Sequence, residues 1–310
     1  MSGPPSPARI WAALAVVYVV WGSTYLFILI ASRTLPVFVM SSLRFTIAGG
    51  LLYAWSIRRG DTVGDRPGRR EWAAAAVVGA ALFLVGNAGV AWAEKRVDTG
   101  VASLIIAAVP LWMALFDRAV CGQRLSRTAV IGLALGFGGV ALLAWPSGPN
   151  HIDVGGAIAL LVAGAGWASG SLYSRRAPLP RRPFVSASMQ MLAGGILLAI
   201  AAAATGEMTD VHDVSTTSIL ALLYLIVFGS WLAFTCYSWL LRKTRTSLVS
   251  TYAYVNPLVA VFLGWAVENE SVSPRTVVAG VVILAAVALI VTPPKGERAT
   301  EPAPVPVRGR

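Results

Sequence analysis

Charged residues are scarce in this sequence. Only 13% of its 310 residues are charged, whereas soluble domains carry about 25%. Hydrophobic residues make up 56% of the chain, and the mean hydropathy is +0.70. So little polar surface cannot keep a protein of this size dissolved in water. We therefore expect the chain to be embedded in a lipid bilayer.

Cysteine and histidine are also rare. Cys121 and Cys236 lie far apart inside apolar runs, which gives neither a metal-binding spacing nor a disulfide framework, so we interpret both as packing residues. His151 and His212 fall in connections between apolar runs. The fourteen carboxylates lie in loops, in tails or near the ends of runs, which disfavours a central proton relay. No cofactor or metal is expected.

Ten apolar runs are long enough to cross a bilayer, which takes about 20 residues. They cover 10–31, 36–57, 72–93, 99–120, 128–146, 153–173, 183–204, 217–241, 247–268 and 275–292. Their connections are short, which excludes a soluble catalytic domain. We expect residues 1–9 to form a short cytoplasmic N-terminus and the Pro-, Glu- and Arg-rich segment 293–310 to be a disordered cytoplasmic tail.

The basic residues are distributed unequally between the two sides of the membrane. Both termini and the connections after runs two, four, six and eight carry twenty Lys and Arg residues. The opposite side carries only Arg33, Lys95, Arg96 and Arg275. This asymmetry predicts that both termini are cytoplasmic in a multi-pass protein of a bacterial inner membrane. The net charge of +11 therefore comes from basic residues in the connections and termini of a membrane protein, and no nucleic-acid partner is expected.

The sequence repeats itself. Trp21 matches Trp167 at an offset of 146, and Pro110 matches Pro257 at an offset of 147. Each repeat holds five runs, an odd number, so the second repeat enters the membrane in the opposite orientation. The predicted fold is all-α, a polytopic membrane protein of ten transmembrane helices in two inverted five-helix repeats, 10–146 and 153–292. Such repeats are typical of alternating-access carriers with a site near the midplane.

Two predicted helices carry aromatic and hydroxyl residues at equivalent places. Trp21 and Tyr25 are four residues apart, as are Trp167 and Ser171, so each pair shares one helix face. Either these faces line a cavity or their small and hydroxyl residues allow close helix packing.

Pro110 and Pro257 interrupt the fourth and ninth runs, with Tyr252 and Asn256 beside the second. A proline inside a helix removes one backbone hydrogen bond. Paired interruptions point to hinges at a carrier's binding site, and the alternative is a structural kink that membrane helices tolerate.

Asn87 in the third run and Trp231 in the eighth are further candidates. A buried amide in lipid needs partners, so Asn87 either binds substrate or pins neighbouring helices. Trp231 either lines the site or belongs to an interfacial aromatic belt. Arg44 is the only charge well inside a run. We consider three roles for it: it attracts a substrate carboxylate, it neutralises Glu94, or its long side chain extends toward the membrane surface.

Several of these segments resemble the EamA family of the drug/metabolite transporter superfamily, most closely its YedA-like branch of inner-membrane permeases. They are Val-Trp-Gly-Ser-Thr-Tyr at 20–25, Arg44-Phe45, Gly86-Asn87, the Pro110 run and Ser-Thr-Tyr-Ala-Tyr-Val-Asn-Pro at 250–257. The resemblance implies ten helices, alternating access, a central cavity, and export or exchange of metabolites or drugs. The sequence departs from it at Gln123 and Gln190, which stand where the resemblance leads us to expect acids.

The sequence therefore predicts a secondary transporter whose partners are a small-molecule substrate and the lipid bilayer. The alternatives are a channel-like facilitator and an intramembrane enzyme, although the runs lack a convergent nucleophile and base. We expect a monomer or a homodimer.

Overall fold

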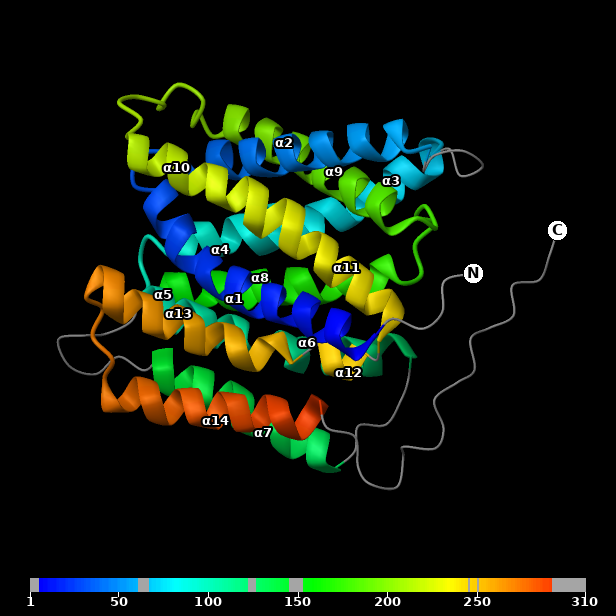
Figure 1. Cartoon of the computed structure of the whole chain (residues 1–310). Helices are drawn as coiled ribbons and strands as arrows, with labels where there is room; N and C mark the ends of the chain where they lie inside the picture. Colours follow the sequence, from blue (N-terminus) through cyan, green and yellow to red (C-terminus); the bar gives the residue numbers. More distant parts are fainter. Residues whose placement is uncertain are drawn as a thin grey trace.

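The computed structural model describes residues 6–60, 67–121, 127–144, 153–244, 246–249 and 251–291. Within these ranges the regular structure is entirely helical. Figure 1 shows the helices running side by side, with their connections gathered at two opposite ends of the bundle. The predicted tail 293–310, the residues around Gln123 and the connection 147–152 lie outside the described residues.

The helices are named in chain order. They are α1 (Pro7–Ala31), α2 (Val37–Arg58), α3 (Arg69–Gly79), η1 (Ala80–Asn87), α4 (Ala88–Ala93), α5 (Thr99–Ile106), α6 (Val109–Cys121), α7 (Arg127–Ala144), α8 (Val154–Ser174), α9 (Pro183–Ala204), α10 (Thr216–Tyr224), η2 (Leu225–Leu232), α11 (Ala233–Lys243), α12 (Thr246–Val249), α13 (Tyr252–Glu268) and α14 (Pro274–Val291).

In the part of the chain that the structure describes, seven helical stretches are long and apolar enough to cross a membrane, which confirms an all-helical, polytopic membrane protein. They are Pro7–Ala31, Val37–Arg58, Arg69–Ala93, Thr99–Val120, Val154–Ser174, Pro183–Ala204 and Thr216–Leu240. Helices suit this solvent because each one satisfies its backbone hydrogen bonds internally.

Two of the long stretches contain a π-helix that the apolar pattern does not predict. In η1 the helix ends with Ala88 N–H donating to the Phe83 carbonyl, five residues back. The second π-helix, η2, includes Gly229 and Ser230. A π-helix inserts extra residues into an otherwise regular helix and is frequent at functional sites. Both π-helices contribute polar residues to the centre of the bundle.

The two prolines occupy different positions in their helices. The chain leaves helical geometry between α5 and α6, so Pro110 is the second residue of α6 rather than a mid-helix residue. Its missing N–H therefore costs little there. Pro257 lies inside α13 and lines the central cavity.

Close packing joins α2, α3 and α9 on one edge of the bundle, and α7 pairs with α14 on the opposite edge (Figure 1). A Cβ atom added to Gly79 of α3 would lie 2.7 Å from the Gly194 nitrogen of α9. Glycine at Gly79 is therefore what allows these two backbones to approach. The central cavity lies between the two edges.

Candidate substrate-binding cavity

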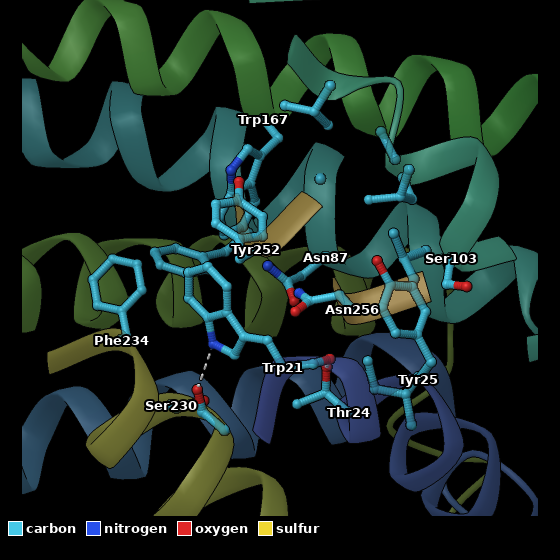
Figure 2. A pocket seen from close by; sticks show the side chains of 18 of the residues that line it. Trp21, Thr24, Tyr25, Asn87, Ser103, Trp167, Ser230, Phe234, Tyr252 and Asn256 are labelled. Carbon is cyan, nitrogen blue, oxygen red and sulfur yellow. Dashed lines mark hydrogen bonds between the residues drawn. The ribbon is translucent and has the colours of Figure 1, made fainter. Parts of the chain in front are cut away.

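A cavity of about 100 Å³ lies in the middle of the bundle. Its walls come from α1, α2, η1, α4, α5, α6, α8, α9, η2, α11 and α13. Figure 2 shows its main side chains, which are Trp21, Thr24, Tyr25, Asn87, Ser103, Trp167, Ser230, Phe234, Tyr252 and Asn256. The site is therefore aromatic and polar at once, as pockets for small amphipathic molecules are.

Trp21 is the centre of the aromatic wall. Its ring meets Trp167 edge-to-face with centroids 6.0 Å apart and Tyr252 edge-to-face at 5.3 Å. Tyr237 of α11 packs against the same indole at 4.8 Å. The indole Nε1–H donates to the Gly229 carbonyl of η2 at 3.1 Å, the dashed line in Figure 2. One side chain therefore connects α1 with α8, α11, η2 and α13.

Two amide side chains supply much of the polar surface. The Asn87 Nδ2 donates to the Leu82 carbonyl at 3.2 Å, across one turn of η1. With its amide turned so that the nitrogen meets acceptors, Asn256 donates to the Tyr252 and Tyr18 carbonyls at 3.1 Å each. The Asn87 nitrogen is therefore engaged within η1, and the Asn256 nitrogen connects α13 with α1. The amide oxygens are the groups left to receive a hydrogen bond from a solute.

Arg44 is the one charged side chain among the described residues that line the cavity. It is only 5% exposed, and its Nε donates to the Ser230 Oγ at 2.8 Å. A Cβ atom on Gly229 would lie 3.1 Å from Arg44 Nη2, so the glycine makes room for the guanidinium. The α2 charge is thereby fixed against η2 in the middle of the bundle.

Glu94, the first residue after the Arg69–Ala93 stretch, is buried. It is 3% exposed, and neither of its carboxylate oxygens has a hydrogen-bond partner within the described ranges. Burial raises the pKa of this carboxyl well above its usual range, and nearby Glu270 raises it further, whereas Arg44 acts in the opposite direction. The sequence places Glu94 at the end of a run, and helix packing then encloses it.

Most of the predicted site residues meet in one place. Seven of the nine substrate-binding candidates line the cavity: Trp21, Tyr25, Arg44, Asn87, Trp167, Tyr252 and Asn256. Ser171 lines a neighbouring vestibule instead. Trp231 is 40% exposed and lines neither space, because it follows Ser230 directly and so projects from a different side of η2.

Several cavity residues were missing from the predicted set. Phe45 and Phe83 pack with ring centroids 4.3 Å apart between α2 and η1, and Phe234 lies beside them at the start of α11. Phe234 is four residues beyond Ser230, a spacing that could have been read from the sequence. The two other phenylalanines look like ordinary apolar residues, and only the fold brings them to the cavity.

The two ends of the bundle differ. At one end a vestibule of about 440 Å³, lined by Ser174, Arg175 and Arg181 among others, shares Trp167, Phe234 and Tyr252 with the central cavity. We call this the vestibule end. It holds the connection between α8 and α9.

Cross-connections join helices at the other end, which we call the closed end. Arg33, after α1, pairs with Glu268 of α13. The Glu207 carboxylate accepts from the Phe38 N–H of α2 at 2.6 Å. The Glu270 carboxylate accepts from the Thr99 N–H of α5 at 2.8 Å. Each of these two carboxylates caps the start of a helix, where an anion is stabilised by the free N–H groups.

Membrane-length helices arranged around an aromatic and polar cavity are typical of membrane transporters. The family model of the EamA-like transporter family matches residues 8–145 and 154–292. This chain belongs to that family, so it is a membrane transporter rather than an enzyme, and its substrate is accordingly a small molecule.

Relatives agree with this assignment. The chain is 37% identical over 283 residues, 91% of its length, to the uncharacterized inner membrane transporter YedA of Escherichia coli, of which 90% is covered. A probable terminal-alkyne amino-acid exporter of Streptantibioticus cattleyicolor is 27% identical, with 91% of this chain and 92% of the relative covered. A crystal structure with 22% identity has the same fold, with a TM-score of 0.63 over 92% of this chain and 96% of the other.

Proposed function

We propose that the protein is a secondary transporter, an exporter or exchanger, that moves a small metabolite or drug across a bacterial inner membrane by alternating access. The observation that carries this proposal is the difference between the two ends. The cavity shares Trp167, Phe234 and Tyr252 with a vestibule at one end, whereas Arg33–Glu268 and the Glu207 and Glu270 caps join helices at the other. An alternating-access carrier exposes its site to one side at a time.

The proposed architecture is ten spanning helices in two inverted repeats, 10–146 and 153–292. The seven long stretches, the two shorter apolar helices Val130–Leu142 and Pro274–Leu289, and α13 make up the ten. Pairwise packing supports the symmetry: α2 packs on its proposed repeat mate α9, and α7 packs on α14. Likewise α1 packs on α13, as α8 packs on α6.

The proposed orientation has both termini and the vestibule end in the cytoplasm. The vestibule is lined by Arg175 and Arg181 of a connection rich in arginine, and basic connections favour the cytoplasmic side. The closed end then faces outward, and the described arrangement is the inward-open state. Export begins in this state, because a cytoplasmic solute reaches the cavity through the vestibule.

The proposed substrate class is a small amphipathic solute that carries a carboxylate, such as a zwitterion. Arg44 supplies a positive charge that no other lining residue within the described ranges matches or cancels. Hydrogen bonds from a guanidinium to a carboxylate are roughly twice as strong as neutral ones. The amide oxygens of Asn87 and Asn256 would accept from an ammonium group, and Trp21 and Trp167 would pack on an apolar part. The amino-acid exporter of Streptantibioticus is consistent with this class.

The proposed site comprises Trp21, Tyr25, Arg44, Asn87, Trp167, Tyr252 and Asn256. Ser171 belongs to its entrance, and Pro257 is the proposed hinge of α13. Pro110 acts as a hinge only through the break before α6. Trp231 is assigned to the lipid-facing surface, since its side chain is exposed.

Counterflow of a labelled amino-acid mixture in proteoliposomes tests the proposal. We expect saturable exchange that Asn256→Ala abolishes while folded protein remains in the membrane. Trp231→Ala is the matched control and should exchange at the wild-type rate. Flux that does not saturate would contradict a carrier and favour a channel-like facilitator.

A further inference from the structure

The carboxyl of Glu94 is buried at the closed end without a hydrogen-bond partner for either oxygen within the described ranges. An ionised carboxylate left unpaired in such a place is strongly destabilising, so a buried acid of this kind takes up a proton. Nothing in the proposed cavity accounts for it, because Glu94 does not line that space.

The charged and titratable groups around Glu94 come from several elements. Tyr25 of α1 and Arg44 of α2 interact with it electrostatically, and Glu270, between α13 and α14, raises its proton affinity. Asp98, in the following connection, interacts with Glu270. The two basic residues that follow Glu94 in the chain, Lys95 and Arg96, are exposed, and the Arg96 guanidinium lies over the Trp92 ring, 3.7 Å from its centroid.

The remaining neighbour, α8, offers no compensating charge. It packs along α4, and its residues from Val154 to Ser174 include no acidic or basic side chain. Arg44 is therefore the only cation shown to act on Glu94 in the described structure, and its Nε is engaged with Ser230.

We propose that Glu94 is the proton-binding site of this transporter, protonated while the closed end is closed and free to release its proton when that end opens. The inference rests on the proposed alternating-access function and adds the coupling ion, H⁺. In the protonated state Glu94 no longer neutralises Arg44, so the full guanidinium charge is available to a substrate carboxylate in the cavity. Protonation, closure and carboxylate binding therefore favour one another.

The direction of the pH effect follows from linkage. Opening hydrates Glu94 and returns its pKa toward that of a water-exposed Glu, about 4.3. The Glu94 carboxyl has the higher pKa in the closed arrangement, so protonation favours closure fully when the pH is below the pKa of the hydrated carboxyl. This stabilisation of the closed arrangement is lost as the pH rises through the pKa of the buried carboxyl. One proton changes the ratio of open to closed molecules by up to about tenfold per pH unit between those limits.

Pulsed electron paramagnetic resonance on the full chain in lipid nanodiscs measures this ratio without any substrate. Nitroxides are attached at Lys95→Cys and Asp210→Cys, two exposed positions at the closed end, after Cys121 and Cys236 are replaced by serine. We expect a short distance at about pH 5 and a longer one that gains population toward about pH 9. Glu94→Gln, which cannot ionise, should keep the short distance throughout.

Two further variants make the result specific. Glu268→Gln removes a carboxylate that is paired with Arg33 at the same end, and it should retain the wild-type pH slope. Glu94→Asp keeps an acid and should retain the slope with a shifted midpoint, which guards against a Gln variant that folds poorly.

A wild-type distance that does not change with pH would overturn the proposal, and so would a Glu94→Gln variant with the wild-type slope. If the pH dependence of the distance were lost in Asp98→Asn but kept in Glu94→Gln, the proton would be assigned to Asp98, and the proposal for Glu94 would equally be overturned. Counterflow at constant pH decides the carrier function separately, because exchange needs no change in proton concentration.

Discussion

Trp21 and Trp167 meet edge-to-face with ring centroids 6.0 Å apart, although they are separated by 146 residues. The sequence identifies them as equivalent members of two repeats, and the fold brings the two indoles together at the central cavity. Edge-to-face pairs of this kind add about 0.5–1.5 kcal/mol beyond burial. Helices α1 and α8 thus meet through side chains that also face the proposed substrate.

Replacing Trp21 with Phe separates its packing from its hydrogen bond. The variant keeps an aromatic ring near Trp167 and Tyr252 but loses the N–H that donates to the Gly229 carbonyl. Leaving that carbonyl unpaired costs about 1–3 kcal/mol. We expect roughly a tenfold or greater loss of exchange in Trp21→Phe and complete loss in Trp21→Ala, measured as initial counterflow rates. A Trp21→Ala protein that exchanges like wild type would remove the aromatic wall from the site.

Replacing Arg44 should act selectively on carboxylate-bearing solutes. Hydrogen bonds to a charged group contribute about 1.5–3 kcal/mol, so Arg44→Gln should weaken the inhibition of counterflow by a free amino acid at least tenfold. The same acid with its carboxylate amidated should inhibit both proteins about equally. Equal weakening for both compounds would mean that Arg44 supports the fold, through Ser230, rather than the substrate.

Helix packing at Gly79 should be sensitive to a single methyl group. A Cβ atom there would lie 2.7 Å from the Gly194 nitrogen, and overpacking costs about 1–3 kcal/mol. Gly79→Ala should therefore lower the midpoint of thermal unfolding in detergent. Gly138→Ala is the matched control, because a Cβ there meets nothing within 4 Å. A stable Gly79→Ala protein would show that α3 and α9 are free to separate.

The cap on α2 should hold the closed end together. Glu207→Gln removes the negative charge of the carboxylate that accepts a hydrogen bond from the Phe38 N–H. Charges at a helix terminus contribute about 0.3–1 kcal/mol to stability. We expect the open population to rise about two- to fivefold, measured by the nitroxide distances between positions 95 and 210. Glu71→Gln removes an acidic cap from α3 at the vestibule end and should leave that population unchanged.

The helical segments follow closely from the sequence, whereas the site follows only in part. The run 183–204 coincides with α9, and 36–57 differs from α2 by one residue at each end, because proline and charge delimit apolar runs. The π-helices η1 and η2 leave no mark in hydropathy. The burial of Glu94 is equally hidden, since it depends on how α8, α2 and α1 pack against α4. Long-range packing, rather than local pattern, decides both.

Alternating access is tested most directly by locking the closed end. Cysteines at Arg33 and Glu268, which form an ion pair across that end, are joined by a short reducible thiol cross-linker in a chain without other cysteines. Counterflow of the labelled amino-acid mixture is then measured before and after reduction. We predict that cross-linking abolishes exchange and that reduction restores it. Exchange at the same rate in the cross-linked protein would show that this end never opens during transport, and would contradict the mechanism.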